Sequence, residues 1–159
     1  MAELTLPSGH VALIDEGDLD RVVAAGPWRI HRDRSNLYVR RLTVRKKRGP
    51  EQALHSFLTD WPMVDHVNGD GLDNRRANLR PANHSQNAAN RIRLHGRTGL
   101  RGVTRHRSGR WQAAITVAGK YFYLGLHSTP EDAARAYDVA AVAAFGEYAR
   151  PNFPPAVAS

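Results

Sequence analysis

The spacing of apolar and polar residues predicts a mixed α+β structure in the first sixty residues. Residues 15–26 begin with acids and end at Gly26, which is typical of a short helix. Residues 52–60 fit either a short helix or a strand. Strands are predicted where a short apolar run or an alternating pattern occurs, at residues 10–14, 27–33 and 37–45. Residues 1–60 therefore form the first predicted section of the chain.

Residues 61–92 contain a strand, a turn-rich loop and a helix by the same criteria. The run MVDHV predicts a short strand, and the NG and DG dipeptides at residues 68–71 predict tight turns. The stretch NHSQNAANRIR is rich in Ala, Gln and Arg, which are compatible with a helix. Residues 93–98 follow as a glycine-containing linker.

A separate unit is predicted for residues 99–154, followed by a tail at residues 155–159. Ser-Gly and Ala-Gly dipeptides divide its first half into three β-rich runs. Thr129 can cap the helix that follows, and Gly146 can end it. We expect three antiparallel strands with one helix packed across them, so the fold class of the whole chain is α+β.

Composition limits the possible classes of protein. The chain has 159 residues, of which 42% are hydrophobic, so it can bury a core in one ordinary domain or two small ones. It has no cysteine, which excludes disulfides and cysteine-ligated metal sites. No apolar run approaches the roughly 18 residues of a membrane span, and the first residues do not resemble a signal peptide.

The charge distribution indicates a polyanionic partner. The net charge is +8, and residues 74–130 contain no Asp or Glu but eleven Lys and Arg residues. Ten of these eleven are Arg, whose planar fork matches phosphate groups and base edges. Because an ordinary solvated surface mixes both signs, this segment favours nucleic acid. A basic surface without such a role is the alternative.

The segment VDHVNGDGLDNRRANLR, residues 64–80, concentrates Asp, Asn and His side chains. Asp65 and His66 are neighbours on the predicted strand, and Asn87 lies on the predicted helix, so a chain that folds back could bring them together. Asp and Asn oxygens suit Mg²⁺, or Mn²⁺, better than zinc. A neutral His66 could take a proton from an attacking water. This set predicts metal-dependent hydrolysis of a phosphodiester.

Other readings of the same segment stay open. His84 and Asn90 each lie three residues from Asn87, nearly on the same helical face, so both are alternative ligands. Residues 68–73 fit ordinary turns, and they lack the spacing and the closing Glu of a calcium loop.

The motif DHVNGDGLDNRRANLRPANHSQNAAN closely resembles the HNH nuclease family with its ββα-metal fold, and in particular the HNH homing endonucleases of phage-type mobile elements. The resemblance implies that His66 is the general base and that Asp65 and Asn87 bind the metal. It implies that Asn78 braces the loop and orients the base. Asn87 would replace the final His of the family motif. His55 also falls within the resemblance, although HSF stands where relatives read His-Arg-Leu.

Residues 99–154 resemble the DNA-binding domain of plant ethylene-response (APETALA-type) factors. The motifs RGV, WQAAI, YLG, AARAYD, FGEYA and NFP occur in the order and spacing of that family. The resemblance implies a sheet that enters the major groove of double-stranded DNA. Thr104, His106 and Ser108 depart from plant members, so a GC-box preference does not transfer. The predicted DNA-binding residues are Arg101, Arg105, Arg107, Arg110 and Trp111 in this unit, with Arg75, Arg76, Arg91 and Arg93 before it.

Together these features predict a DNA endonuclease of the homing or mobile-element type, targeted by a C-terminal DNA-binding domain. A single active site implies nicking, and the choice between monomer and dimer stays open. We expect no membrane partner, no small-molecule cofactor, and a cytoplasmic location in a bacterial or phage-infected cell. Two alternatives remain. One is a DNA-binding transcriptional regulator with an inactive HNH module, and the other is an RNA-binding or RNA-cutting protein.

Overall fold

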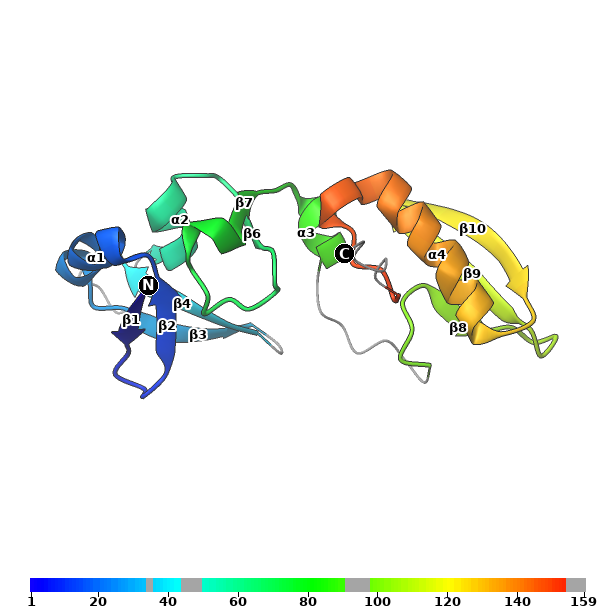
Figure 1. The fold of residues 1–159 in the computed structure, drawn as a ribbon, viewed down its shortest axis with the longest axis horizontal. Coiled ribbons are helices and arrows are strands. Elements are labelled where there is room, and N and C mark those ends of the chain that lie inside the picture. Colours follow the sequence, from blue (N-terminus) through cyan, green and yellow to red (C-terminus); the bar gives the residue numbers. More distant parts are fainter. Residues whose placement is uncertain (34–35, 44–49, 91–97, 154–159) are drawn as a thin grey trace, which may run out of the picture. The chain divides into compact units, whose positions relative to one another are not determined.

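The computed structural model describes residues 1–33, 36–43, 50–90 and 98–153. The chain divides into two compact units, Met1–Asn83 and His84–Ser159, here called unit 1 and unit 2 (Figure 1). The predicted linker at residues 93–98 lies mostly outside the described residues, and the border between the units precedes it. None of the described helices is long and apolar enough to span a membrane.

The described residues of unit 1 form three small antiparallel sheets and two short α-helices. The chain begins with a hairpin of β1 and β2 and continues through α1 into a three-stranded sheet in the order β3-β4-β5. Helix α2 and a two-stranded sheet of β6 and β7 complete the unit. The bounds are β1 Ala2–Thr5, β2 Val11–Ile14, α1 Leu19–Ala25, β3 Arg29–Asp33, β4 Asn36–Leu42, β5 Glu51–Ala53, α2 Leu54–Thr59, β6 Val64–His66 and β7 Leu79–Pro81, with 3-10 turns η1 Glu16–Asp18 and η2 Arg76–Asn78.

The core of unit 1 is built from large apolar side chains. Ile14, Val22 and Leu54 are completely buried, and Trp28 is nearly so. The Trp28 indole donates a hydrogen bond to the Val22 carbonyl at 2.7 Å, so its one polar group is satisfied inside the core. Burial of these side chains supplies the main stabilisation of the unit.

The sequence predicted most of these elements correctly. Strand β2, helix α1 and the β3–β4 pair fall where the patterns placed them. Residues 52–60, which fitted helix or strand, contribute to both, because β5 leads directly into α2. Strand β1 was not predicted, since four residues with an alternating burial pattern give too weak a signal by themselves.

Unit 2 consists of a short helix, a three-stranded antiparallel sheet in the order β10-β9-β8, and a long helix that lies along the sheet (Figure 1). This arrangement confirms the α+β class and the predicted three strands with one helix. The bounds are α3 His84–Asn90, β8 Val103–Arg105, β9 Trp111–Val117, β10 Lys120–His127, α4 Pro130–Phe145 and the 3-10 turn η3 Gly146–Tyr148.

Helix α4 begins and ends where its local signals place it. The Thr129 hydroxyl accepts a hydrogen bond from the Asp132 backbone N–H at 3.1 Å, which satisfies one of the unpaired donors of the first turn. Gly146 follows the last helical residue with a φ of 54°, a left-handed value that glycine adopts without strain.

Small side chains allow α4 to lie close against the sheet. Ala113 of β9 and Ala133 and Ala134 of α4 are fully buried at this contact. Gly102 is required here, because its φ is +69° and a Cβ would lie 2.0 Å from the Tyr137 ring. The RGV motif therefore has a structural cause in close backbone packing.

Candidate nucleic-acid interface

The face of the unit 2 sheet opposite α4 is polar and aromatic. Cross-strand partners share a face, and Val103, buried with Ala113 against the helix, fixes which face is which. Tyr121 and Tyr123 expose 61% and 56% of their surface on the opposite face. The side chains on this opposite face, here called the open face, are Thr104, Gln112, Ala114, Thr116, Tyr121, Tyr123 and Leu126.

The open face presents groups that can contact a nucleic acid directly. The Gln112 amide nitrogen lies 2.6 Å from the Tyr121 hydroxyl, so the two polar groups are held together. An amide and hydroxyls can hydrogen-bond base edges, and B-DNA's major groove admits a β-ribbon. Period-two alternation in KYFYLGLH could have identified Tyr121, which the prediction omitted.

The end of β8 and the turn that follows it carry three of the predicted arginines. Arg105, Arg107 and Arg110 are all exposed. Arg110 donates a hydrogen bond to the Leu126 carbonyl at 2.6 Å, and the Arg105 guanidinium lies 4.7 Å from the Trp111 ring centroid. The structure thus brings these arginines together at one end of the sheet.

Trp111 and Arg101 do not lie on the open face. Trp111 packs against the core cluster between the sheet and α4. Arg101 is only 9% exposed, and its guanidinium donates to the Ala89 carbonyl of α3 at 2.8 Å. Contact of either residue with DNA remains a prediction.

Charges in unit 2 are segregated between its layers. The strands and turns from Val103 to His127 carry Arg105, Arg107, Arg110 and Lys120 and no acid. All four acids of the unit lie on α4 and η3, namely Glu131, Asp132, Asp138 and Glu147. The sheet layer is therefore the side of unit 2 that attracts a polyanion.

The polar motif of unit 1 forms a partly buried hydrogen-bond network. Asn78 accepts a hydrogen bond from the Asn68 backbone N–H at 3.0 Å and donates to the Asp73 carbonyl at 2.8 Å. Asn68 in turn donates to the Asp73 carboxylate at 2.9 Å. Residues 67–78 are thereby fixed as one closed loop.

Asp65 and His66 are engaged inside unit 1. The Asp65 carboxylate accepts two hydrogen bonds from its cross-strand partner Arg80, at 2.9 and 2.7 Å, and both side chains are nearly buried. His66 is 6% exposed, and its Nε2 lies 3.4 Å from the Asn74 side-chain oxygen. Asn87 belongs to α3 of unit 2, so the four predicted site residues do not share one unit.

Burial makes both histidines of this region poor proton acceptors. His55 and His66 have ring centroids 5.1 Å apart. Burial lowers the pKa of His66 below its ordinary value. Burial, with smaller contributions from His66 and Arg40, lowers the pKa of His55 to about 3.

The other predicted arginines also have internal partners or fall outside the described residues. Arg75 binds Asp73 through two hydrogen bonds at 2.8 and 2.7 Å, and Arg76 binds Asp18 through two at 2.9 Å. Arg91 and Arg93 lie outside the residues that the structure describes.

The donor set does not assemble into a metal cage within the described parts of the chain. No group of three or more His, Asp or Glu side chains there is placed to hold an ion. The Arg80 guanidinium already forms an ion pair with the Asp65 carboxylate. Binding of Mg²⁺ or Mn²⁺ by Asp65 and Asn87 stays a prediction.

Comparison with known proteins identifies the C-terminal part of the chain. Residues 98–147 match the family model of the AP2 domain. APETALA2-like protein 2 of Oryza sativa subsp. indica is 49% identical over 63 residues, which is 38% of this chain and 14% of the relative. The AP2-like ethylene-responsive transcription factors AIL5 and ANT of Arabidopsis thaliana are 56% identical over 61 residues and 59% identical over 56 residues, or 36% and 33% of this chain.

These matches concern a domain and not the full length of either protein. The chain covers 14%, 11% and 10% of the three relatives. Unit 2 therefore contains an AP2 domain, and the structure extends this unit to Asn152, which accepts a hydrogen bond from the Arg101 backbone N–H at 2.6 Å.

The comparisons correct the predicted activity. The ethylene-responsive relatives are named as transcription factors and not as enzymes, so the predicted DNA endonuclease, with its hydrolase class and its homing or mobile-element type, is wrong. Nothing in these matches supports an HNH module. The structure gives a physical reason, since Asp65 and His66 pair with Arg80 and Asn74 inside unit 1. The transcriptional-regulator alternative agrees better with the findings.

The predicted location is corrected as well. The relatives include proteins named as transcription factors from Arabidopsis thaliana and from rice. A cytoplasmic enzyme of a bacterial or phage-infected cell does not fit such relatives.

Proposed function

We propose that this chain is a sequence-specific double-stranded DNA-binding protein that regulates transcription. The observation that carries the proposal is the coincidence of the AP2 match with a sheet whose open face is polar, aromatic and free of acids. AP2 domains bind double-stranded DNA, and the relatives are named as transcription factors. In a plant cell this role places the protein in the nucleus.

The open face supplies base contacts, and the β8–β9 turn supplies phosphate contacts. Gln112 of the central strand β9 and Thr104 of β8 are cross-strand partners on the open face, where their amide and hydroxyl groups meet base edges. Tyr121 and Tyr123 pack against sugars and methyl groups. Arg105, Arg107 and Arg110 hold the backbone at the end of the sheet. Phosphate contacts position the domain, and base contacts specify the sequence.

Selection from a random duplex library with the full chain tests the proposal. An enriched sequence is expected, and fluorescence anisotropy then measures affinity for that duplex and for a scrambled one. Gln112→Ala should reduce discrimination between the two duplexes by roughly tenfold, since one good base contact contributes about 1–3 kcal/mol. A reporter gene carrying the enriched sequence should respond to wild type and much less to Gln112→Ala.

Val139→Ala is the matched control. Val139 is 73% exposed on α4, the layer that lies behind the sheet, so its removal should leave discrimination unchanged. Equal affinity for enriched and scrambled duplexes would contradict the proposal. Equally strong competition by a structured RNA would favour the RNA-binding alternative instead.

A further inference from the structure

Strand β10 is an exposed edge of the unit 2 sheet. It stands at one end of the order β10-β9-β8, so only one of its two sides has a described strand beside it. Three consecutive aromatic side chains lie on this strand, and Tyr121, Phe122 and Tyr123 are 61%, 47% and 56% exposed. Exposed aromatic edges of this kind are templates for pairing with another strand.

The register shows which backbone groups of β10 point away from the sheet. The Ala114 backbone N–H donates to the Gly102 carbonyl, on the side of β9 that faces away from β10. Tyr123 is the cross-strand partner of Ala114, so the N–H and C=O of Tyr123 also point away from β9. The same alternation turns the backbone groups of Tyr121 outward. Among the described residues none forms a hydrogen bond with these outward groups.

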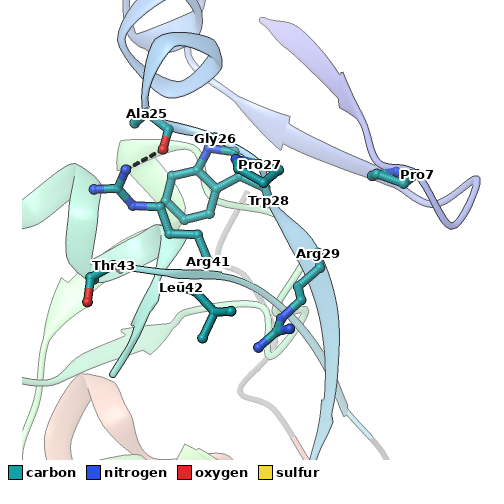
Figure 2. A pocket seen from close by; sticks show the side chains of 9 residues that line it. All are labelled: Pro7, Ala25, Gly26, Pro27, Trp28, Arg29, Arg41, Leu42 and Thr43. Atoms are coloured by element: carbon teal, nitrogen blue, oxygen red, sulfur yellow. Dashed lines mark hydrogen bonds between the residues drawn. The ribbon is translucent and has the colours of Figure 1, made fainter. Parts of the chain in front are cut away.

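The polar groups beside Trp28 in unit 1 show the opposite situation. Figure 2 shows the Arg41 guanidinium turned toward the Ala25 carbonyl, to which it donates a hydrogen bond, with the Trp28 ring next to it. The same guanidinium donates to the Gln52 side-chain oxygen at 3.1 and 2.9 Å. Its hydrogen-bonding capacity is used inside the fold, whereas the outward groups of β10 are available to a partner strand.

The outer edge of β10 is complementary to itself. When a second β10 runs antiparallel beside the first with Phe122 opposite Phe122, Tyr121 of each copy lies opposite Tyr123 of the other. The tyrosine pairs then exchange backbone hydrogen bonds, and the two Phe122 residues form the closer pair that has none between them. Lys120, the one formally charged residue of the strand, lies opposite Leu124 and not opposite a second Lys120. Aromatic cross-strand pairs add stability to such a ladder.

We propose that β10 pairs with β10 of a second copy of this chain, so that the two unit 2 sheets form one continuous sheet. The proposal goes beyond the proposed function, because it requires no DNA. An antiparallel pair of identical strands has a two-fold axis, so the contact closes at two copies. Side chains keep their faces across the contact, so both open faces lie on the same side of the joined sheet.

The strand itself limits the size of this contact. The register of β10 shifts between Tyr123 and Gly125, and Gly125 has a φ of 112°. Regular pairing ends at such a bulge. Each copy therefore contributes far fewer than the roughly 20–30 residues that a stable interface has on each side. We expect a weak dimer, with a dissociation constant between about 10 μM and 1 mM.

A cysteine introduced at the centre of the contact tests the register. The natural sequence has no cysteine, so Phe122→Cys supplies a unique thiol in the full chain. Opposite residues without hydrogen bonds between them have Cα atoms about 4.5 Å apart, which a disulfide can span. Mild oxidation should therefore convert Phe122→Cys to a covalent dimer on a non-reducing gel.

Val139→Cys is the matched control for cross-linking. Val139 is 73% exposed on α4, so a thiol there is at least as accessible as one at position 122. It lies away from the β10 edge and should cross-link only at the level of random collision. Equal cross-linking of the two variants would overturn the proposal.

Charge changes at Phe122 distinguish a broken contact from a broken fold. In Phe122→Lys a pair of like charges replaces an aromatic pair, so the dissociation constant from sedimentation equilibrium should rise about tenfold. Phe122→Glu should have the same effect by itself, and an equimolar mixture of the two variants should associate again. Val139→Lys should leave the association of wild type unchanged.

Two results of the charge experiment would contradict the β10 contact. One is a mixture of Phe122→Lys and Phe122→Glu that associates no better than either variant alone. The other is a wild-type dimer that Phe122→Lys leaves intact, since association would then use a different surface.

Discussion

The two units of the molecule use similar polar residues in opposite ways. In unit 1, Asn68, Asp73 and Asn78 bond to one another and close a loop. In unit 2, Gln112 and Tyr121 lie on the sheet face opposite α4, and Tyr121 is 61% exposed there. The difference teaches that a concentration of polar residues identifies neither catalysis nor binding by itself. Polar side chains that bond to one another inside the fold are not available to a ligand, whereas those on an exposed face are.

The cores of the two units differ in the size of the side chains that they bury. Unit 1 buries Ile14, Val22 and Leu54, so its stability depends on large apolar surfaces and on the polar loop beside them. Unit 2 buries alanines between α4 and the sheet, so close backbone approach is its requirement. Substitutions should therefore break unit 2 by adding atoms and unit 1 by removing polar partners.

The largest expected effect is the loss of unit 2 in Gly102→Ala. The new Cβ would meet the Tyr137 ring at 2.0 Å and would hold an L-residue at positive φ. Strain of about 1–2 kcal/mol and overpacking of about 1–3 kcal/mol should together cost about 2–5 kcal/mol. Amide hydrogen exchange should show unit 2 unprotected and unit 1 unchanged.

Gly119→Ala is the control for that substitution. Gly119 has a φ of +79° but nothing within 4 Å of its missing Cβ, so only the conformational cost of about 1 kcal/mol applies. Equal losses of protection in the two variants would show that the Tyr137 contact has no special weight.

A smaller effect is expected from Asn78→Ala in unit 1. The change removes hydrogen bonds to Asn68 and Asp73 and leaves the buried Asp73 carbonyl without this donor, which should cost about 2–3 kcal/mol in the free energy of unfolding. Denaturant unfolding measures it. Asn36→Ala, whose side chain makes contacts of 3.3 and 3.5 Å, should cost under about 1 kcal/mol. A loss no greater than that of Asn36→Ala would contradict the closed-loop description.

Acid should destabilise unit 1 more than unit 2. His55 has a pKa of about 3 when folded and an ordinary value of 6.5 when unfolded, so between these values the unfolded chain binds the extra proton. Stability is therefore full above pH 6.5 and falls as the pH drops, by about 2 kcal/mol at pH 5. His66, whose pKa is also lowered, adds to the same trend.

Thermal unfolding at pH 7 and pH 5 checks this expectation, with hydrogen exchange to separate the units. The described histidines of unit 2 are not buried, so its protection should change less. His55→Gln removes the titrating group and should flatten the pH dependence of unit 1. An equal decrease in both units would point to net charge instead of the buried histidines.

The sequence by itself determined the local structure of unit 2. Thr129, Pro130 and Gly146 define helix α4, and the Ala118-Gly119 turn, with φ values of 50° and 79°, defines the β9–β10 hairpin. These signals act over a few residues, so they do not depend on the rest of the fold. The AP2 resemblance could be recognised from the sequence for the same reason. Its motifs are short, and they contain residues that close packing requires, such as Gly102.

Only the tertiary structure decided which polar side chains have hydrogen-bond or ion-pair partners inside the fold. Asp65 meets Arg80 across β6 and β7, Arg76 reaches Asp18, and His66 turns toward Asn74. Asn87 falls in the second unit with α3, although the sequence suggested a single motif. A side chain's partner depends on which distant segments pack together, and no local pattern contains that information. Of the four residues read as a nuclease site, the structure places Asn78 in the network that closes a loop, Asp65 against Arg80 and His66 beside Asn74.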